Sequence, residues 1–295
     1  MAEIQKAQDR LDVLEKIKKL EEQGIFDKDV EDDPPTLPLL PDQIDYKRKK
    51  LINKIKRFFT YRGITKVVNG MIKQGLFQIK EIKGIENLQS VKTGAILTCN
   101  HFSAADSFAM HIAFKSAKIK HKRLFRVIRE GNYTNPPKGF EMVMRYCDTL
   151  PLSDNKSTMK KFLKCTNELI QAGNFVLIYP EESMWWNYRK PKPLKPGAYR
   201  FAVKNNVPVV PFFITMEDSA VIGPDGFPVQ IYTIHVDKPI YPDANLDLKT
   251  NVENMKNQNF NVWVDIYEKT YGIKLQYNTK VTENTEDIVK KHVKM

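Results

Sequence analysis

Hydrophobic positions along the chain change their spacing near residue 84. From residue 46 to residue 77, apolar side chains recur every three or four positions, which predicts helical structure. Lysines and arginines stand between them, so we expect a basic amphipathic helical segment, with Gly63 and Gly70 as points where it divides into two helices. A weaker helical pattern with alternating charges covers residues 3–22, and the four prolines of residues 34–41 end it.

Beyond residue 84, short apolar runs alternate with helical stretches. We expect buried strands at residues 95–99, 124–128, 149–152, 175–179 and 209–214, and an alternating edge strand at 229–236. Helices are expected at residues 107–117, 158–172, 198–204 and 252–271. The alternation predicts an α/β fold, in which a mixed sheet is flanked by helices in one domain.

Four parts of the chain follow from these patterns. They are an acidic helical appendage with a proline-rich linker (1–42), a basic amphipathic helical segment for membrane association (43–78), the main domain (79–272) and a polar C-terminal tail (273–295). An alternative for residues 1–23 is a helix that packs directly on the main domain.

Charge is distributed unevenly along the chain. Residues 43–83 carry 12 lysines and arginines against two acidic residues, within a formal net charge of +12 for the whole chain. A helix with one apolar and one basic face can lie in the headgroup layer of an anionic membrane, although a core-packed helical pair with a basic outer face fits the pattern equally well. Nucleic acid is not an expected partner, because apolar side chains interrupt the basic ones and no recognised nucleic-acid motif is present.

The cysteines and the N-terminal residues bear on the compartment. Cys99, Cys147 and Cys165 are far apart, so neither a disulfide framework nor a zinc site is expected. The first residues lack the basic start and apolar stretch of a signal peptide, and no run of roughly 18 apolar residues follows. We therefore expect a cytoplasmic protein, peripheral on the inner face of the membrane.

One histidine and one aspartate stand out as candidate chemistry. His101 follows the predicted strand 95–99 directly, and Asp106 comes five residues later, at the start of the next helix. Loops at strand ends usually carry the reactive groups of α/β folds. An aspartate at this distance can fix the tautomer of the imidazole and stabilise its protonated form, so the pair predicts a general base.

Three sequence blocks occur in a fixed order: NHFSAAD at residues 100–106, YPEES at 179–183 and VPVVP at 207–211. They resemble the Asn-His-x-x-x-x-Asp block (the HX4D motif), the Phe-Pro-Glu-Gly-Thr block and the fourth block of the glycerolipid acyltransferase superfamily, typified by bacterial 1-acylglycerol-3-phosphate acyltransferases. The resemblance covers roughly residues 79–240.

By this resemblance, the chain is an acyltransferase of phospholipid biosynthesis. His101 is the general base that deprotonates the acceptor hydroxyl, and Asp106 orients it. The donor is acyl-CoA or acyl carrier protein, the acceptor is a lysophospholipid or glycolipid, and neither a metal nor another cofactor is required. Backbone N–H groups of residues 102–106 are candidates to stabilise the tetrahedral intermediate.

The resemblance also indicates residues that bind the acceptor. These are Tyr179, Pro180, Glu181, Glu182 and Ser183 of the second block. Family members that act on lysophosphatidate carry arginines where this chain has Met184 and Ser153, and neither side chain can bind phosphate as a guanidinium does.

Nearby cations are candidates to replace the two missing arginines. They are Arg189, Lys190, Lys192 and Lys195, of which Arg189 and Lys195 are predicted to bind the acceptor. Beside them, Trp185 and Trp186 are expected to line a headgroup pocket, to anchor in the membrane interface or to belong to an ordinary loop. Arg126 and Arg129 are weaker candidates. Two other functions stay open: a thioesterase-like hydrolase that uses the same base, and a non-enzymatic protein that binds membranes or nucleic acid through its basic segment.

Overall fold

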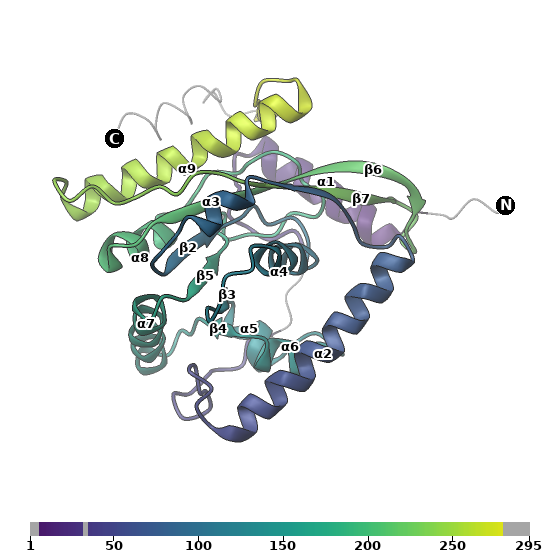
Figure 1. Ribbon diagram of the computed structural model, residues 1–295. Helices are drawn as coiled ribbons and strands as arrows, with labels where there is room; N and C mark the ends of the chain where they lie inside the picture. The colour runs from purple at the N-terminus through teal and green to yellow at the C-terminus, as the bar shows by residue number, and fades with distance from the viewer. Residues whose placement is uncertain (1–5, 32–34, 280–295) are drawn as a thin grey trace.

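A seven-stranded mixed sheet forms the centre of the computed structural model, which describes residues 6–31 and 35–279 (Figure 1). The strand order is β1-β7-β6-β2-β5-β3-β4, and every neighbouring pair is parallel except β6 and β7. The strands are β1 (Gln78–Lys83), β2 (Ala95–Thr98), β3 (Leu124–Ile128), β4 (Thr149–Pro151), β5 (Phe175–Ile178), β6 (Val209–Ile222) and β7 (Pro228–Val236).

Helices lie on both faces of this sheet. They are α1 (Gln8–Glu22), α2 (Leu51–Lys73), α3 (Ile85–Gln89), α4 (Asp106–Ser116), α5 (Glu130–Thr134), α6 (Glu141–Tyr146), α7 (Lys156–Gln171), α8 (Gly197–Asn205) and α9 (Leu248–Tyr271). The predicted α/β class, with a mixed sheet flanked by helices, is confirmed.

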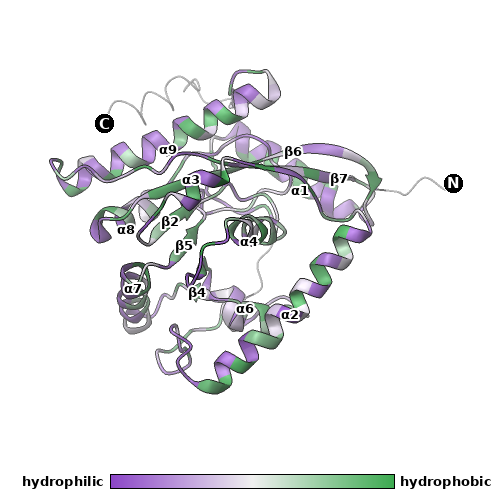
Figure 2. Ribbon diagram, viewed as in Figure 1, coloured by the Kyte–Doolittle hydropathy of each residue, from purple (hydrophilic) through white to green (hydrophobic). Residues whose placement is uncertain are grey.

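The two faces of the sheet bury two separate hydrophobic cores. In β2, Ile96 points into a core that α1, α7, α8 and α9 cover, whereas Ala95 and Leu97 point into a core that α3, α4 and the end of α2 cover. Strands buried on both faces have continuous apolar runs, which explains why β2 and β5 were readable in the sequence (Figure 2).

The strand β7 was wrongly expected at an edge of the sheet. It lies between β6 and β1, and β1 itself was not predicted. The two isoleucines of β1 stand three positions apart in the sequence. In the structure, a register shift between Ile79 and Glu81 accommodates this spacing and leaves Lys80 unpaired. The alternation of apolar and polar positions that predicts a strand is therefore missing from this short segment.

The basic segment is one helix rather than two. A Cβ at Gly63 or Gly70 would meet nothing within 4 Å, so both glycines face open space. Each costs about 1 kcal/mol relative to alanine in a helix, and tertiary contacts offset that cost. Val68 packs into the second core, and Arg57 pairs with the buried Asp148. No helix of the described chain is long and apolar enough to cross a membrane.

The N-terminal segment packs along the main domain, which was the alternative left open. Val13 and Ile17 of α1 are buried in the first core, as is Tyr46 further along. At the other end of the chain, Leu275 and Tyr277 are also buried there. The ends of the predicted appendage and tail, residues 1–5 and 280–295, lie outside the described residues.

Candidate active site

Two loops meet at the carboxyl end of the central strands. β2 and β5 are parallel neighbours, and Thr98 pairs with Ile178, so the segments that follow both strands leave the sheet at the same edge. Backbone bonds then join the loops, because the N–H of Trp185 donates to the carbonyl of His101 at 3.2 Å. The first and second sequence blocks are therefore brought together.

The first loop carries the predicted dyad. His101 Nδ1 lies 2.8 Å from Asp106 Oδ2, so the neutral imidazole donates from Nδ1 and keeps its Nε2 lone pair. The carboxylate is fully buried at the start of α4, whereas the imidazole is 25% exposed. This arrangement leaves one basic nitrogen of the histidine available to a substrate proton.

Tyr179 holds the dyad from the second loop. Its ring stacks on the imidazole of His101, with centroids 4.1 Å apart and planes 20° from parallel, and its hydroxyl donates to Asp106 Oδ1 at 2.7 Å. Burial, and then the charge of Asp106, raise the pKa of Tyr179 well above its usual value, so the phenol keeps its proton. The family block noted above has phenylalanine here, and phenylalanine cannot make this hydrogen bond.

Most N–H groups of the first loop are already used. Those of Phe102 and Ser103 donate to Asp106 Oδ2 at 3.1 and 3.3 Å, and those of Ala105 and Asp106 donate to Ser103. Among residues 102–106, the N–H of Ala104 is the one for which no acceptor is found in the described part of the chain. The N–H groups of this loop therefore mainly hold Asp106 and Ser103 in place. The expectation that several of them stabilise an oxyanion reduces to the single N–H of Ala104.

Glu181 is buried beneath the loop rather than exposed to an acceptor. One carboxylate oxygen accepts from the N–H of His101 at 3.0 Å, and the other accepts from the N–H of Lys192 at 2.9 Å. Burial raises the pKa of Glu181, and the charge of Lys192 opposes that shift. The geometry assigns Glu181 to holding the backbone of His101.

Lys192 was expected among the cations near the acceptor, but it is instead the buried counter-charge of this glutamate. Its side chain is 1% exposed, with Nζ 3.6 Å from Glu181 Oε2. It donates to the carbonyl and the hydroxyl of Ser183 at 2.7 Å each, and the Ser183 hydroxyl donates to the carbonyl of Phe26 at 2.6 Å. Burial lowers the pKa of Lys192 to about 8. Ser183 is therefore also enclosed.

Asn100, the first residue of the first block, fixes the loop to β6. Its amide donates to the carbonyl of Ile214 at 3.0 Å and accepts from the N–H of Ile214 at 2.8 Å. The strand that carries the third block thereby positions the histidine next in sequence. The sequence shows this asparagine directly before His101, which is the feature that could have indicated its positioning role.

The cations expected to bind the acceptor are paired with acids. Arg189 donates to Asp218 at 2.7 Å, and Lys195 donates to Asp27 at 2.7 Å. Asp29, two residues on from Asp27, accepts from the N–H of Met184 at 3.1 Å. The acidic N-terminal segment therefore lies against the loop that the sequence suggested for phosphate.

The two tryptophans differ in their environments. Trp185 is fully buried against Phe26, and its indole N–H donates to the carbonyl of Lys28 at 2.7 Å, so it is not an interfacial anchor. Trp186 is only partly buried and packs on Phe227. The first tryptophan thus joins the N-terminal segment to the site.

Ser153 and Glu182 occupy structural positions. The Ser153 hydroxyl is buried and donates to Glu130 at 2.7 Å. Glu182 has a positive φ of 62°, and its carbonyl accepts from Arg129 at 2.7 Å. Pro180 also contributes its backbone, because its carbonyl accepts from the N–H of Lys195 at 2.8 Å.

A second partly buried histidine, His111, lies in α4 beside α2. The Nδ1 atom of His111 accepts from Arg126 at 3.1 Å, and Tyr61 stacks on its ring. Burial, followed by the charge of Arg126, lowers the pKa of His111 to about 3, so it stays neutral. In the described residues, no group of three or more His, Cys, Asp or Glu side chains is placed to hold a metal ion.

Part of this chain is similar to known proteins. Residues 80–215 match the family model described as Acyltransferase. A chloroplastic 1-acyl-sn-glycerol-3-phosphate acyltransferase of Brassica napus is 31% identical over 150 residues, which are 51% of this chain and 40% of that protein. Its counterpart from Arabidopsis thaliana is 31% identical over 145 residues, 49% of this chain and 38% of that protein.

A solved structure is also similar. The 1-acyl-sn-glycerophosphate acyltransferase of Thermotoga maritima aligns with a TM-score of 0.49 and 17% identity, over 78% of this chain and 100% of that one. The chain spans about two fifths of the length of its plant relatives. The family match begins within β1, ends within β6 and includes both loops of the site. Residues 80–215 of this chain are therefore similar to the acyltransferase family, in keeping with the order of the three blocks.

Proposed function

We propose that this chain transfers a fatty acyl group from a thioester donor to the hydroxyl of a lysophospholipid or glycolipid at a membrane surface. The observation that carries the proposal is the dyad, in which His101 Nδ1 is held 2.8 Å from a buried Asp106 while the imidazole stays partly exposed. This is the geometry of a general base oriented by a carboxylate.

The reaction needs no covalent intermediate on the protein. His101 Nε2 takes the proton of the acceptor hydroxyl as its oxygen attacks the thioester carbonyl carbon. The carbon–sulfur bond then breaks, and the imidazolium returns the proton to the leaving thiolate, so the products are an ester and a free thiol. The N–H of Ala104 is the loop donor that remains for the tetrahedral oxyanion.

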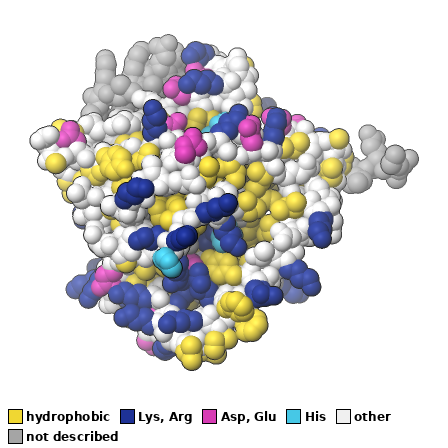
Figure 3. Space-filling model, in the orientation of Figure 1, with side chains coloured by type: hydrophobic (Ala, Val, Ile, Leu, Met, Phe, Trp, Pro, Cys, Tyr) yellow, Lys and Arg dark blue, Asp and Glu magenta, His cyan; other side chains and the backbone are white. Residues whose placement is uncertain are grey.

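A membrane surface is the expected source of the acceptor. The first half of α2 exposes an apolar stripe on the side away from the domain, made of Leu51, Ile52, Ile55, Phe58 and Phe59, with exposed fractions from 44% to 72%. Figure 3 shows apolar side chains at the lower edge of the molecule among lysines and arginines. Such a stripe with basic neighbours suits the headgroup layer of an anionic bilayer.

The catalytic assignment is tested with His101→Ala. We expect turnover to fall by about 10³-fold while the fold is kept, because the substitution removes the base from a partly exposed position. The exposed His121→Ala serves as the matched control. Acyl-CoA and acyl carrier protein are assayed separately, each with a lysophosphatidate acceptor. Full turnover by His101→Ala would overturn the assignment.

The same assay separates transfer from hydrolysis. Free fatty acid is measured with and without the acceptor, because the dyad could activate water in place of an alcohol. Transfer predicts that the acceptor diverts the acyl group into ester. A product distribution that no tested acceptor changes would favour the hydrolase instead.

A further inference from the structure

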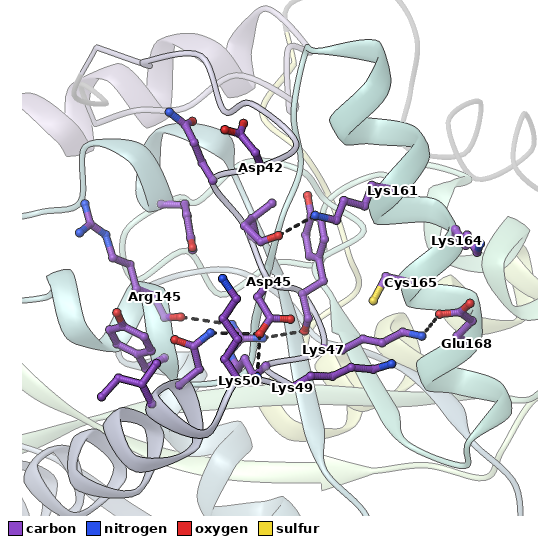
Figure 4. Close-up of a pocket in the computed structure, with 18 residues that line it drawn as sticks. Asp42, Asp45, Lys47, Lys49, Lys50, Arg145, Lys161, Lys164, Cys165 and Glu168 are labelled. Atoms are coloured by element: carbon purple, nitrogen blue, oxygen red, sulfur yellow. Dashed lines mark hydrogen bonds and ion pairs between the residues drawn. The ribbon is translucent and has the colours of Figure 1, made fainter.

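A wide pocket lies apart from the dyad, at the start of α2. It has a volume of about 670 Å³ and is formed by residues 42–50, the first turn of α2, the end of α6 and one face of α7 (Figure 4). Neither loop of the candidate active site contributes to its lining. We refer to it as the basic pocket, because its lining includes seven lysines and arginines against three acidic residues.

Two of these lysines are already engaged. Lys47 forms an ion pair with Glu168. Lys161 donates to the carbonyls of Pro41 and Ile44 at 2.6 and 2.8 Å, which ties the N-terminal segment to α7. These bonds hold the walls of the pocket together. Among the other lining residues, lysines and arginines still outnumber acidic residues.

Four cations of the pocket are exposed and form no ion pair with a described residue. They are Lys49, Lys50, Arg145 and Lys164. In Figure 4, Arg145 lies on one side of the pocket and Lys164 on the other, with Lys49 and Lys50 between them. Four positive charges from three segments line one hollow, which favours a multivalent anion such as a phosphate.

A buried arginine adds an unused donor to the lining. Arg48 is 4% exposed, and its terminal nitrogens donate to the carbonyls of Tyr46 at 3.0 Å and Thr149 at 2.7 Å. Its Nε–H is buried with no hydrogen-bond partner in the described structure. An unpaired buried donor is costly, so the lining contains one polar group that the described chain leaves unsatisfied.

The basic pocket adjoins the apolar stripe. Ile52 lines the pocket and is also 53% exposed as a member of the stripe. α2 begins there at Leu51, where the Asp45 carboxylate accepts from the N–H of Lys50 at 3.4 Å and from the amide of Asn53 at 3.0 Å. A ligand with a phosphate in the pocket would therefore have its acyl chains beside the stripe.

We propose that the basic pocket binds the phosphate of an anionic phospholipid while the apolar stripe of α2 enters the acyl-chain layer. The occupant is a lipid rather than free phosphate, because the site pairs a cationic hollow with an adjoining exposed apolar surface. The proposal deepens the proposed function and rests on its membrane location, but it concerns a site separate from the dyad.

Vesicle binding tests the proposal. The full chain and a variant with Lys49→Gln, Lys50→Gln, Arg145→Gln and Lys164→Gln are cosedimented with phosphatidylcholine vesicles, with and without phosphatidylglycerol. Since a basic residue near an anionic surface contributes roughly a fivefold factor, the variant should lose about 10²-fold or more of its binding to the anionic vesicles. Binding to neutral vesicles should change little.

The matched control removes the same charge elsewhere, with Lys120→Gln, Lys204→Gln, Lys238→Gln and Lys249→Gln. All four are exposed and lie outside the basic pocket and α2. We expect less than about a threefold loss, because distant charges are screened. An equal loss in both variants would mean general electrostatic attraction and would overturn the site.

Two further arms separate the alternatives. Displacement of the protein from vesicles by millimolar-range inorganic phosphate would indicate a free-phosphate site and overturn the lipid assignment. Binding of acidic carrier protein that is lost in the pocket variant, with vesicle binding unchanged, would overturn it as well. The His101→Ala variant should bind vesicles normally, so failure of the catalytic proposal and failure of this one give different results.

Discussion

The two loops that meet at the end of the central sheet differ in how their polar groups are used. In the loop after β2, a buried carboxylate holds an imidazole that remains 25% exposed. In the loop after β5, the charged pair Glu181 and Lys192 is at most 2% exposed, and its hydrogen bonds go to the backbone and to Ser183. The first loop leaves one of its polar side chains partly exposed, whereas the second uses its charged pair to hold the first in shape.

The largest effect should come from the reactive loop. Asp106→Asn keeps the size of the side chain but removes the charge that stabilises an imidazolium, so we expect kcat to fall roughly 10³- to 10⁴-fold. Steady-state kinetics measure the change, with the exposed Asp265→Asn on α9 as the control. A loss of less than tenfold would show that the dyad is not the catalytic group, and the contrast between the loops would no longer hold.

The supporting loop should respond in stability. Lys192→Met leaves the carboxylate of Glu181 buried without its counter-charge, which should cost about 3–5 kcal/mol in urea unfolding. Lys195→Met, whose lysine is 39% exposed, should cost less than about 1 kcal/mol.

A double variant guards against a Lys192→Met chain that fails to fold. Adding Glu181→Gln removes the uncompensated charge, so most of the lost stability should return. If Lys192→Met alone is as stable as the parent chain, the second loop does not depend on a buried ion pair.

Tyr179 joins the two loops, and it sharpens the comparison. Tyr179→Phe keeps the stacked ring but removes the hydroxyl that donates to Asp106, and a hydrogen bond to a charged group contributes about 1.5–3 kcal/mol. We expect kcat/KM to fall at least roughly tenfold, with little change in stability. Tyr199→Phe is the control, since that buried hydroxyl has no hydrogen-bond partner in the described chain. Equal effects of the two substitutions would argue against a role for the Tyr179 hydroxyl.

The last prediction concerns His111, whose surroundings differ from those of the partly exposed imidazole of the dyad. His111 has a folded pKa of about 3 against an ordinary value of 6.5, so the unfolded chain binds a proton that the folded chain does not. Stability should therefore fall as the pH drops from about 6.5 towards 3, by at most about 1.4 kcal/mol per pH unit.

Urea midpoints measured across that range test this prediction. His111→Gln should flatten the acid slope, because glutamine does not titrate. His121→Asn, at an exposed position with a positive φ of 59°, should leave the slope unchanged. An unchanged slope in His111→Gln would mean that this histidine is protonated in the folded protein.

Much of the sheet could be predicted from the sequence, because its strands are short, apolar and buried on both faces. β3 was predicted with its observed bounds, and β2, β4 and β5 to within one residue. β1 was missed because its bulge removes the alternation of apolar positions. α2 was divided in two because glycine disfavours a helix locally, while the contacts that keep it continuous come from distant residues such as Asp148.

By itself, the sequence determined the dyad and the order of the blocks around it. His101 and Asp106 lie in one strand-end loop, so their distance depends on local geometry that five residues can specify. Only the tertiary structure decided which other polar groups are available. Lys190 pairs with Glu21 across 169 positions and Lys195 with Asp27 across 168, and no local pattern reports a partner so far along the chain. Cations that looked free in the sequence are thus neutralised, whereas Lys49, Lys50, Arg145 and Lys164, from three separate segments, form the basic pocket.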